Sequence, residues 1–127
     1  DLAPLVFLNG ADSKAAQKAI REIDAAGGIV SAVCHGPAAL VNARRADGSL
    51  LVAGKRVAAF TNGEEEEVQS TRVVPFLLAS MLNERGAHHQ NAANWANNVV
   101  VDGRLITGQN PQSAASLGEA LRDALLA

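Results

Sequence analysis

Hydrophobic positions along the chain follow two spacings, one typical of helices and one typical of strands. After the turn at 9–10, apolar side chains recur at helical intervals from Ala16 to Ile23. Ser13 is placed to cap the start of this helix, and the glycines at 27–28 are placed to end it. The apolar run at 29–33 then predicts a short strand of the kind that is buried in a parallel sheet.

The remainder of the chain continues this alternation. The acidic run at 64–67 is suited to the first turn of a helix, where negative charge complements the helix dipole. No internal repeat or linker interrupts the 127 residues, so we predict a single α/β domain over residues 1–127. The other predicted elements are a strand at 55–60, a helix from Pro75 to Gly86, a polar loop at 91–98, paired strands at 99–101 and 105–107, and a helix at 112–126.

Composition and charge narrow the class of protein. Hydrophobic residues make up 48% of the chain and charged residues 19%, which is typical of a globular domain and excludes intrinsic disorder. Eleven basic residues against thirteen acidic ones, with no basic run, argue against binding to nucleic acid or to an anionic membrane. No apolar run approaches the roughly 20 residues of a membrane span. The single cysteine, Cys34, is typical of a reducing compartment, so we expect a cytoplasmic protein.

Cys34 lies between the strand predicted at 29–33 and a predicted helix with Pro37 in its first turn. This placement is typical of a nucleophile elbow, in which a sharp turn exposes a reactive side chain. The helix N-terminus and the neighbouring His35 both favour the thiolate form, and the small Gly36 lets a substrate approach. A lone cysteine can equally be a buried structural residue. Chemistry alone leaves both interpretations open.

Five segments of the chain carry a recognisable pattern: 33–40, 54–55, 60–66, 74–78 and 101–111. Together they resemble the DJ-1/PfpI superfamily, and within it the branch of Hsp31-like and glyoxalase III proteins. The resemblance runs from about Ser13 to the C-terminus and implies a flavodoxin-like three-layer sandwich with a mostly parallel sheet. Because the apolar stretch at 4–8 starts the chain within a fold, we expect the family's N-terminal segment to be missing from this sequence.

The resemblance implies a role for individual residues. Cys34 matches the nucleophile, His35 the adjacent histidine, and Glu65 the acid that orients this histidine and stabilises its protonated form. We expect the other glutamates of the acidic run (64, 66 and 67) to point to solvent.

Further site residues are implied less directly. Gly10 and Gly36 are candidates for an oxyanion site, and Asn110 and Pro111 match a loop near the family's active site. The last two can equally form only a turn between a strand and a helix. The family also places a glutamate on an early segment, for which this sequence shows no counterpart.

The implied reaction converts methylglyoxal or glyoxal to a 2-hydroxy acid, with no glutathione, metal or other cofactor, in a homodimer. Deglycase and peptidase activities remain open, and the alternative is an Hsp31-like holding chaperone or a cysteine redox sensor. A glutaminase subunit is disfavoured because neither His88 nor His89 has a glutamate two residues later. We expect these two histidines to be solvated rather than to bind metal. For Trp95 the sequence leaves two interpretations open: it borders a pocket, or it only covers the core.

Overall fold

The computed structural model describes residues 11–127, and its main sheet has three strands. The strand order is β1 (Val30–Val33), β5 (Leu105–Gly108) and β4 (Val99–Asp102). β1 and β5 are parallel, whereas β4 and β5 form the expected antiparallel pair. A second, parallel pair joins β2 (Arg56–Val57) to β3 (His88–His89).

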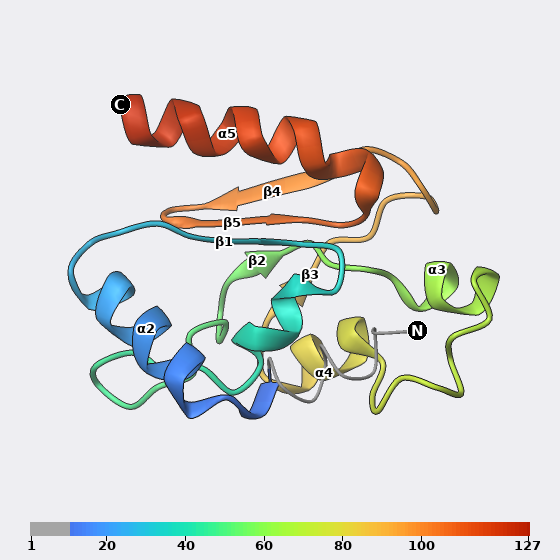
Figure 1. Ribbon diagram of the computed structural model, residues 1–127, viewed down its shortest axis with the longest axis horizontal. Helices are drawn as coiled ribbons and strands as arrows, with labels where there is room; N and C mark the ends of the chain where they lie inside the picture. Colours follow the sequence, from blue (N-terminus) through green and yellow to red (C-terminus); the bar gives the residue numbers. More distant parts are fainter. Residues whose placement is uncertain (1–10) are drawn as a thin grey trace.

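Helices lie on both sides of the three-stranded sheet (Figure 1). The C-terminal helix α5 runs along one side, and α2 and α4 lie on the other. The chain is therefore an α/β fold with helical layers on both sides of the sheet, as expected. Among residues 11–127, the pairs β1–β5 and β2–β3 are parallel and β4–β5 is antiparallel, in line with the predicted mostly parallel arrangement. The helices are α2 (Lys14–Ala25), α3 (Asn62–Glu67), α4 (Leu78–Glu84) and α5 (Ala114–Leu126), with 3-10 helices η1 (Gly36–Leu40) and η2 (Pro111–Ser113).

Local signals determine the ends of α2. The Ser13 side chain accepts a hydrogen bond from the backbone N–H of Ala16 at 3.1 Å, which satisfies one of the free donors of the first turn. After the last turn, Gly27 takes a positive φ of 78°, a conformation that favours glycine. Both predicted boundaries are confirmed.

Three predicted elements are shorter than expected. The helix predicted after Cys34 is only the five-residue 3-10 helix η1. Of the strand predicted at 55–60, only the two residues of β2 form a regular strand. The N–H of Ala58 donates to the Thr107 hydroxyl, and that of Ala59 to the ring of His89, so the backbone ladder ends there. Residue Leu77 has an extended backbone, and α4 therefore begins at Leu78 rather than at Pro75.

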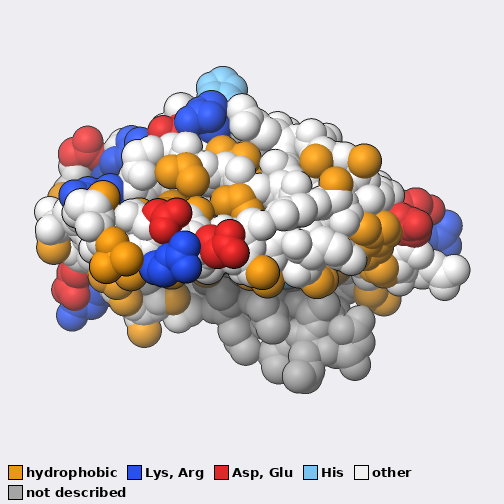
Figure 2. All heavy atoms as spheres, turned by 90° about the horizontal axis from the view of Figure 1, so that it is seen from above, with side chains coloured by type: hydrophobic (Ala, Val, Ile, Leu, Met, Phe, Trp, Pro, Cys, Tyr) orange, Lys and Arg blue, Asp and Glu red, His pale blue; other side chains and the backbone are white. Residues whose placement is uncertain are grey.

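Aliphatic side chains from both sheets and from the helices form one core cluster. Of the four apolar residues after Pro37, which we expect to face the core, Ala38, Leu40 and Val41 are at most 2% exposed, whereas Ala39 is only half-buried. In the part of the chain that the structure describes, no helix is long and apolar enough to cross a bilayer. On the face along α5, basic side chains are interspersed with acidic ones (Figure 2).

Thr107 connects the core of the sheet to the segment that leads to the acidic helix. Its side chain is fully buried, and its hydroxyl accepts from the Ala58 N–H at 2.8 Å. The Thr107→Val substitution keeps the shape of the side chain but leaves this buried N–H without an acceptor. We expect it to lower the free energy of unfolding by about 1–3 kcal/mol, measured by urea denaturation.

The matched control is Thr71→Val, because the Thr71 hydroxyl forms its bond with Glu66 at the exposed surface. This variant should change stability by less than about 0.5 kcal/mol. Equal losses in the two variants would contradict the importance of the Ala58 bond.

Candidate active site

Cys34 directly follows β1 and has a left-handed backbone, with a φ of 62°. Two backbone hydrogen bonds hold it there: its N–H donates to the Gly108 carbonyl, and its carbonyl accepts from the Phe60 N–H, both at 3.0 Å. A non-glycine residue in this conformation costs about 1–2 kcal/mol and persists only where its surroundings impose it. The strained turn predicted for a nucleophile elbow is therefore present.

The His35 ring lies between the thiol and a carboxylate. Its Nδ1 is 3.7 Å from the Cys34 Sγ, and its Nε2 is 3.0 and 3.1 Å from the two carboxylate oxygens of Glu65. The predicted contact between Glu65 and His35 is confirmed. Because each ring nitrogen has a fixed partner, the imidazole can pass a proton to or from the sulfur without rotating.

Glu65 is fully buried in the first turn of α3. A capping box at Thr61 fixes the start of this short helix and so the direction of the side chain. The Ser70 hydroxyl donates to the Oε1 of Glu65 at 2.7 Å, which helps to satisfy the buried charge. Ser70 was not found from the sequence, because a serine after a helix has no distinctive pattern.

The protonated form of His35 is favoured by its two neighbours. Burial of the ring lowers its pKa, but the hydrogen bonds and negative charges of Cys34 and Glu65 outweigh this effect. Together they raise the pKa of His35 from 6.5 to about 9. At neutral pH the ring is therefore an imidazolium, and a positive charge beside the sulfur stabilises the thiolate.

Aromatic rings form one wall of the site. The ring centroids of His35 and Phe60 are 4.3 Å apart, and those of Phe60 and Trp95 are 5.6 Å apart in an edge-on arrangement. The Trp95 indole N–H also donates to Glu67 at 2.8 Å. Trp95 therefore packs on Phe60, the residue that contacts the His35 ring.

The prediction that Glu64 points to solvent is wrong. Its side chain is fully buried and accepts hydrogen bonds from the N–H groups of Thr61 and Trp95 and from the Asn110 amide, at 2.8–2.9 Å. Burial raises its pKa, but these donors reverse the effect and lower the pKa below its usual range. The reason is the capping box, which turns the third helical side chain back toward the helix start. Glu66 and Glu67 are exposed, as expected.

Asn110 and Pro111 lie in different environments. The Asn110 side chain is fully buried, donates to Glu64 and to the Ala96 carbonyl, and accepts from Ser113. It therefore joins the Trp95 loop to η2. Pro111 begins η2 and is exposed.

Of the two candidate oxyanion glycines, only Gly36 can be placed. It begins η1 next to His35, is exposed, and packs against Ala32, where an added Cβ would approach the alanine methyl to 3.4 Å. Gly10 lies outside the described residues.

The two histidines of β3 differ in exposure. His88 is exposed, but His89 is half-buried, and its Nε2 is within 3.2 Å of the backbone N–H and carbonyl of Ala59. The expectation that both are solvated is thus wrong for His89, because β3 pairs with β2 beside Ala59. Within residues 11–127, no three metal-ligating side chains gather into a site.

We expect the His35 ring to titrate near pH 9 in the folded protein, followed by NMR of its Cε1–H group. Because this pKa exceeds the unfolded value of 6.5, the ring's contribution to stability is complete below pH 6.5 and is lost as the pH rises through about 9. Glu65→Gln removes a negative charge and should lower the His35 pKa, whereas the exposed Glu66→Gln should leave it unchanged. A wild-type midpoint near 6.5 would exclude the charged pair.

We expect Glu64→Gln to lower the free energy of unfolding by about 3 kcal/mol, because a neutral amide would face donors from Trp95 and Asn110. The lowered pKa means that the Glu64 carboxylate stabilises the fold above its unfolded pKa and loses this effect as the pH falls through the folded value. The variant should therefore lose less stability than wild type below about pH 4.5. Glu67→Gln, whose amide oxygen can still accept from the Trp95 indole at the exposed end of α3, should cost under about 1 kcal/mol. Equal losses would contradict the buried network.

Comparisons with known proteins show the family of the chain. The model of the DJ-1/PfpI family matches residues 9–124. "Probable glutathione-independent glyoxalase hsp3103" of Schizosaccharomyces pombe is 41% identical over 98 residues, which cover 71% of this chain and 38% of that protein. The crystal structure of glyoxalase III from Candida albicans superimposes with a TM-score of 0.88 and 32% identity, over 94% of this chain and 52% of its own.

The 24 kDa Rapid Encystment Protein of Francisella tularensis superimposes with a TM-score of 0.92 and 36% identity, over 94% of this chain and 53% of its own. The chain thus spans about half the length of these solved structures. The match to the family model covers nearly the whole sequence. With its cysteine elbow and Hsp31-like, glyoxalase-type relatives, the chain belongs to the DJ-1/PfpI family.

Proposed function

We propose that this protein is a glyoxalase III-type enzyme, which converts methylglyoxal or glyoxal to the corresponding 2-hydroxy acid through a Cys34 thioester. The observation that carries the proposal is the His35 ring between the Cys34 sulfur and the buried Glu65 carboxylate. Relatives at 32–41% identity bear glyoxalase names, which supports the choice of substrate. The proposed steps use no glutathione, metal or other cofactor.

The first step is addition of the Cys34 thiolate to the aldehyde carbon. A C–S bond forms, and the C=O electron pair moves to oxygen, which takes a proton from the His35 Nδ1 to give a hemithioacetal. This transfer is suited to a ring that is protonated at neutral pH and lies 3.7 Å from the sulfur. His35 is left neutral and can act as a base.

The second step isomerises the hemithioacetal to a thioester by proton transfers within the substrate. Neutral His35 removes the C–H proton of the hemithioacetal carbon to give an enediol, and it returns this proton to the neighbouring carbon. The hydroxyl proton of the hemithioacetal moves to the neighbouring oxygen, so that the ketone becomes an alcohol and the former aldehyde a thioester. Water then attacks the thioester, the C–S bond breaks, and the 2-hydroxy acid leaves. The thiolate is regenerated, with no net external oxidation or reduction.

Glu65 acts in this scheme as a positioning residue through His35. It holds the ring by Nε2 and stabilises its positive charge, as the carboxylate does in other nucleophile triads. We assign Gly36, together with Gly10, to stabilisation of the developing oxyanion. Asn110 and Pro111 belong to the same proposal as residues that shape the wall of the substrate site.

The proposal includes a cytoplasmic location, which the single cysteine favours, and a homodimer, as the resemblance implies. Deglycase and peptidase chemistry would begin with the same thiolate, so they are tested with the same variants. A holding chaperone or redox sensor is the competing function, and it predicts no aldehyde turnover.

We expect the natural protein to convert methylglyoxal to lactate in buffer without glutathione. Cys34→Ser should abolish the activity, because a hydroxyl lacks the nucleophilicity of a thiolate. Glu65→Gln should lower kcat about 10²-fold or more by losing the orientation and charge of the imidazole. Lactate formation would be measured by an enzymatic endpoint assay.

The matched control is Glu66→Gln, which removes a carboxylate from the exposed face of the same helix and should leave turnover within about twofold. Thermal melts followed by circular dichroism should show that the nearly isosteric serine variant stays folded. Equal turnover by Cys34→Ser would remove Cys34 from the chemistry. No turnover by wild type would contradict the glyoxalase proposal and favour the chaperone.

A further inference from the structure

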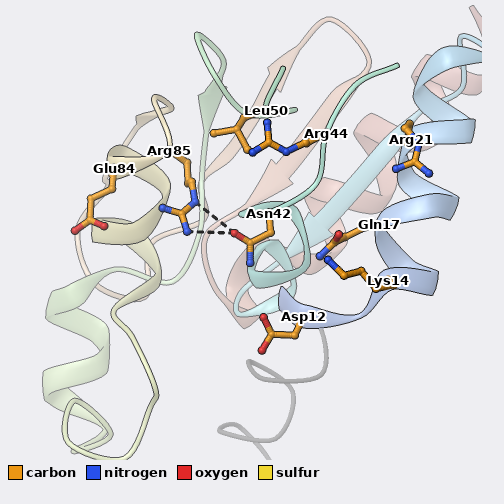
Figure 3. A pocket seen from close by; sticks show the side chains of 9 residues that line it. All are labelled: Asp12, Lys14, Gln17, Arg21, Asn42, Arg44, Leu50, Glu84 and Arg85. Carbon is orange, nitrogen blue, oxygen red and sulfur yellow. Dashed lines mark hydrogen bonds between the residues drawn. The ribbon is translucent and has the colours of Figure 1, made fainter. Parts of the chain in front are cut away.

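A cavity of about 690 Å³ opens between α2, the segment after η1 and the end of α4 (Figure 3). Its lining contains none of the residues of the Cys34 site. Asn42, at its floor, follows the C-terminal end of η1, whereas Cys34 and His35 precede the helix start. Five residues of 3-10 helix span about 10 Å, so the two sites are separate.

Basic side chains dominate the lining of this cavity. Lys14 and Arg21 project from α2, and Arg44 and Arg85 from the opposite walls, against the acidic Asp12 and Glu84. Within residues 11–127, none of the four basic groups has a carboxylate at ion-pair distance. Like charges that face one shared space repel one another, so a bound anion would stabilise the arrangement.

Two of these groups are held in place before any ligand binds. The Arg44 Nη1 donates to the Gly48 carbonyl at 2.7 Å. The Arg85 guanidinium donates from Nε and Nη2 to the Asn42 Oδ1, at 3.4 and 3.2 Å. Asn42 in turn donates to the Ala11 carbonyl, which also accepts from the Gln17 amide. This chain of bonds ties α4 to the start of α2 and reduces the entropy that Arg85 would lose on binding.

Lys14, Gln17 and Arg21 occupy one side of α2. Their spacing of three and four residues places them on the same face of the helix. Figure 3 shows Lys14 and Gln17 pointing toward Asn42, and Arg21 further along the helix. Two cations separated by two helical turns lie about 10 Å apart, so they suit two anionic groups rather than one.

We propose that this cavity binds a small polar metabolite with two phosphate groups, such as a polyol bisphosphate. Arginine guanidinium groups recognise phosphate oxygens in pairs, and lysine supplies a further point charge. The volume lies within the range of small-molecule sites. Among residues 11–127, Leu50 is the one apolar side chain of the lining, and no aromatic ring is present there to stack a base. A hydroxyl-rich carbon chain therefore fits these residues better than a nucleotide.

The test is calorimetric titration of the natural protein with mannitol 1,6-bisphosphate. This probe has no carbonyl group, so it cannot react with Cys34, and the result is independent of the proposed glyoxalase function. We expect a dissociation constant below about 1 mM at low salt, at least about tenfold tighter than inorganic phosphate, with no binding of mannitol. Raising the salt to about 0.5 M should weaken binding, because it screens the charges.

The variant is Lys14→Gln with Arg21→Gln, since these side chains form no hydrogen bond or ion pair among residues 11–127 and their loss should leave the fold intact. We expect its dissociation constant to rise at least about tenfold. The control, Lys18→Gln with Arg122→Gln, removes the same charge from exposed positions outside the cavity and should change affinity by less than about twofold. Thermal melts of both variants verify folding.

Failure of the bisphosphate to bind at about 10 mM would overturn the proposal, as would occupation of the cavity by another part of the natural protein. If the variant and the control lost the same affinity for the bisphosphate, net charge alone would explain the effect, and the proposal would also be overturned. Binding of inorganic phosphate as tight as that of the bisphosphate would contradict two anion subsites.

Discussion

The pairing of the His35 ring with the Glu65 carboxylate joins parts of the chain that are 30 residues apart, and the site depends on it. A buried carboxylate is stable only where donors surround it, and here His35 and Ser70 provide them. The charge in turn keeps the imidazole protonated beside the sulfur. The same contact thus satisfies a buried group, orients a ring and favours a thiolate.

A second buried carboxylate, that of Glu64, lies next to Glu65 in the same turn of α3. The Glu64 carboxylate accepts hydrogen bonds from the backbone N–H groups of Thr61 and Trp95 and from the Asn110 amide, which belong to three separate segments. Trp95 has a left-handed backbone with a φ of 66°, which the surrounding bonds maintain. Through Phe60, the tryptophan reaches the His35 ring. Two adjacent glutamates of one helix turn therefore have different roles: Glu65 binds the His35 ring, and Glu64 holds the Trp95 loop.

Local sequence determined the elements whose signals lie within a few residues. The Ser13 cap, the glycines after α2 and the paired strands β4 and β5 follow from propensity and periodicity, which act over one or two turns. The elbow could also be predicted, because a cysteine between an apolar strand and Pro37 is a local pattern. The roles of His35 and Glu65 were implied by the resemblance to a family, and the structure shows the two side chains in contact.

Tertiary structure alone decided the fate of residues whose sequence context is the same. Glu64 and Glu66 are both acidic residues of one run, yet only Glu64 is enclosed, because Trp95 and Asn110 arrive from distant segments. The strand β3 also depends on a distant partner, since two residues carry no detectable period. Burial and long-range hydrogen bonds depend on which segments meet. The sequence by itself determined the local elements and the position of the reactive cysteine, and the packing of distant segments decided what surrounds it.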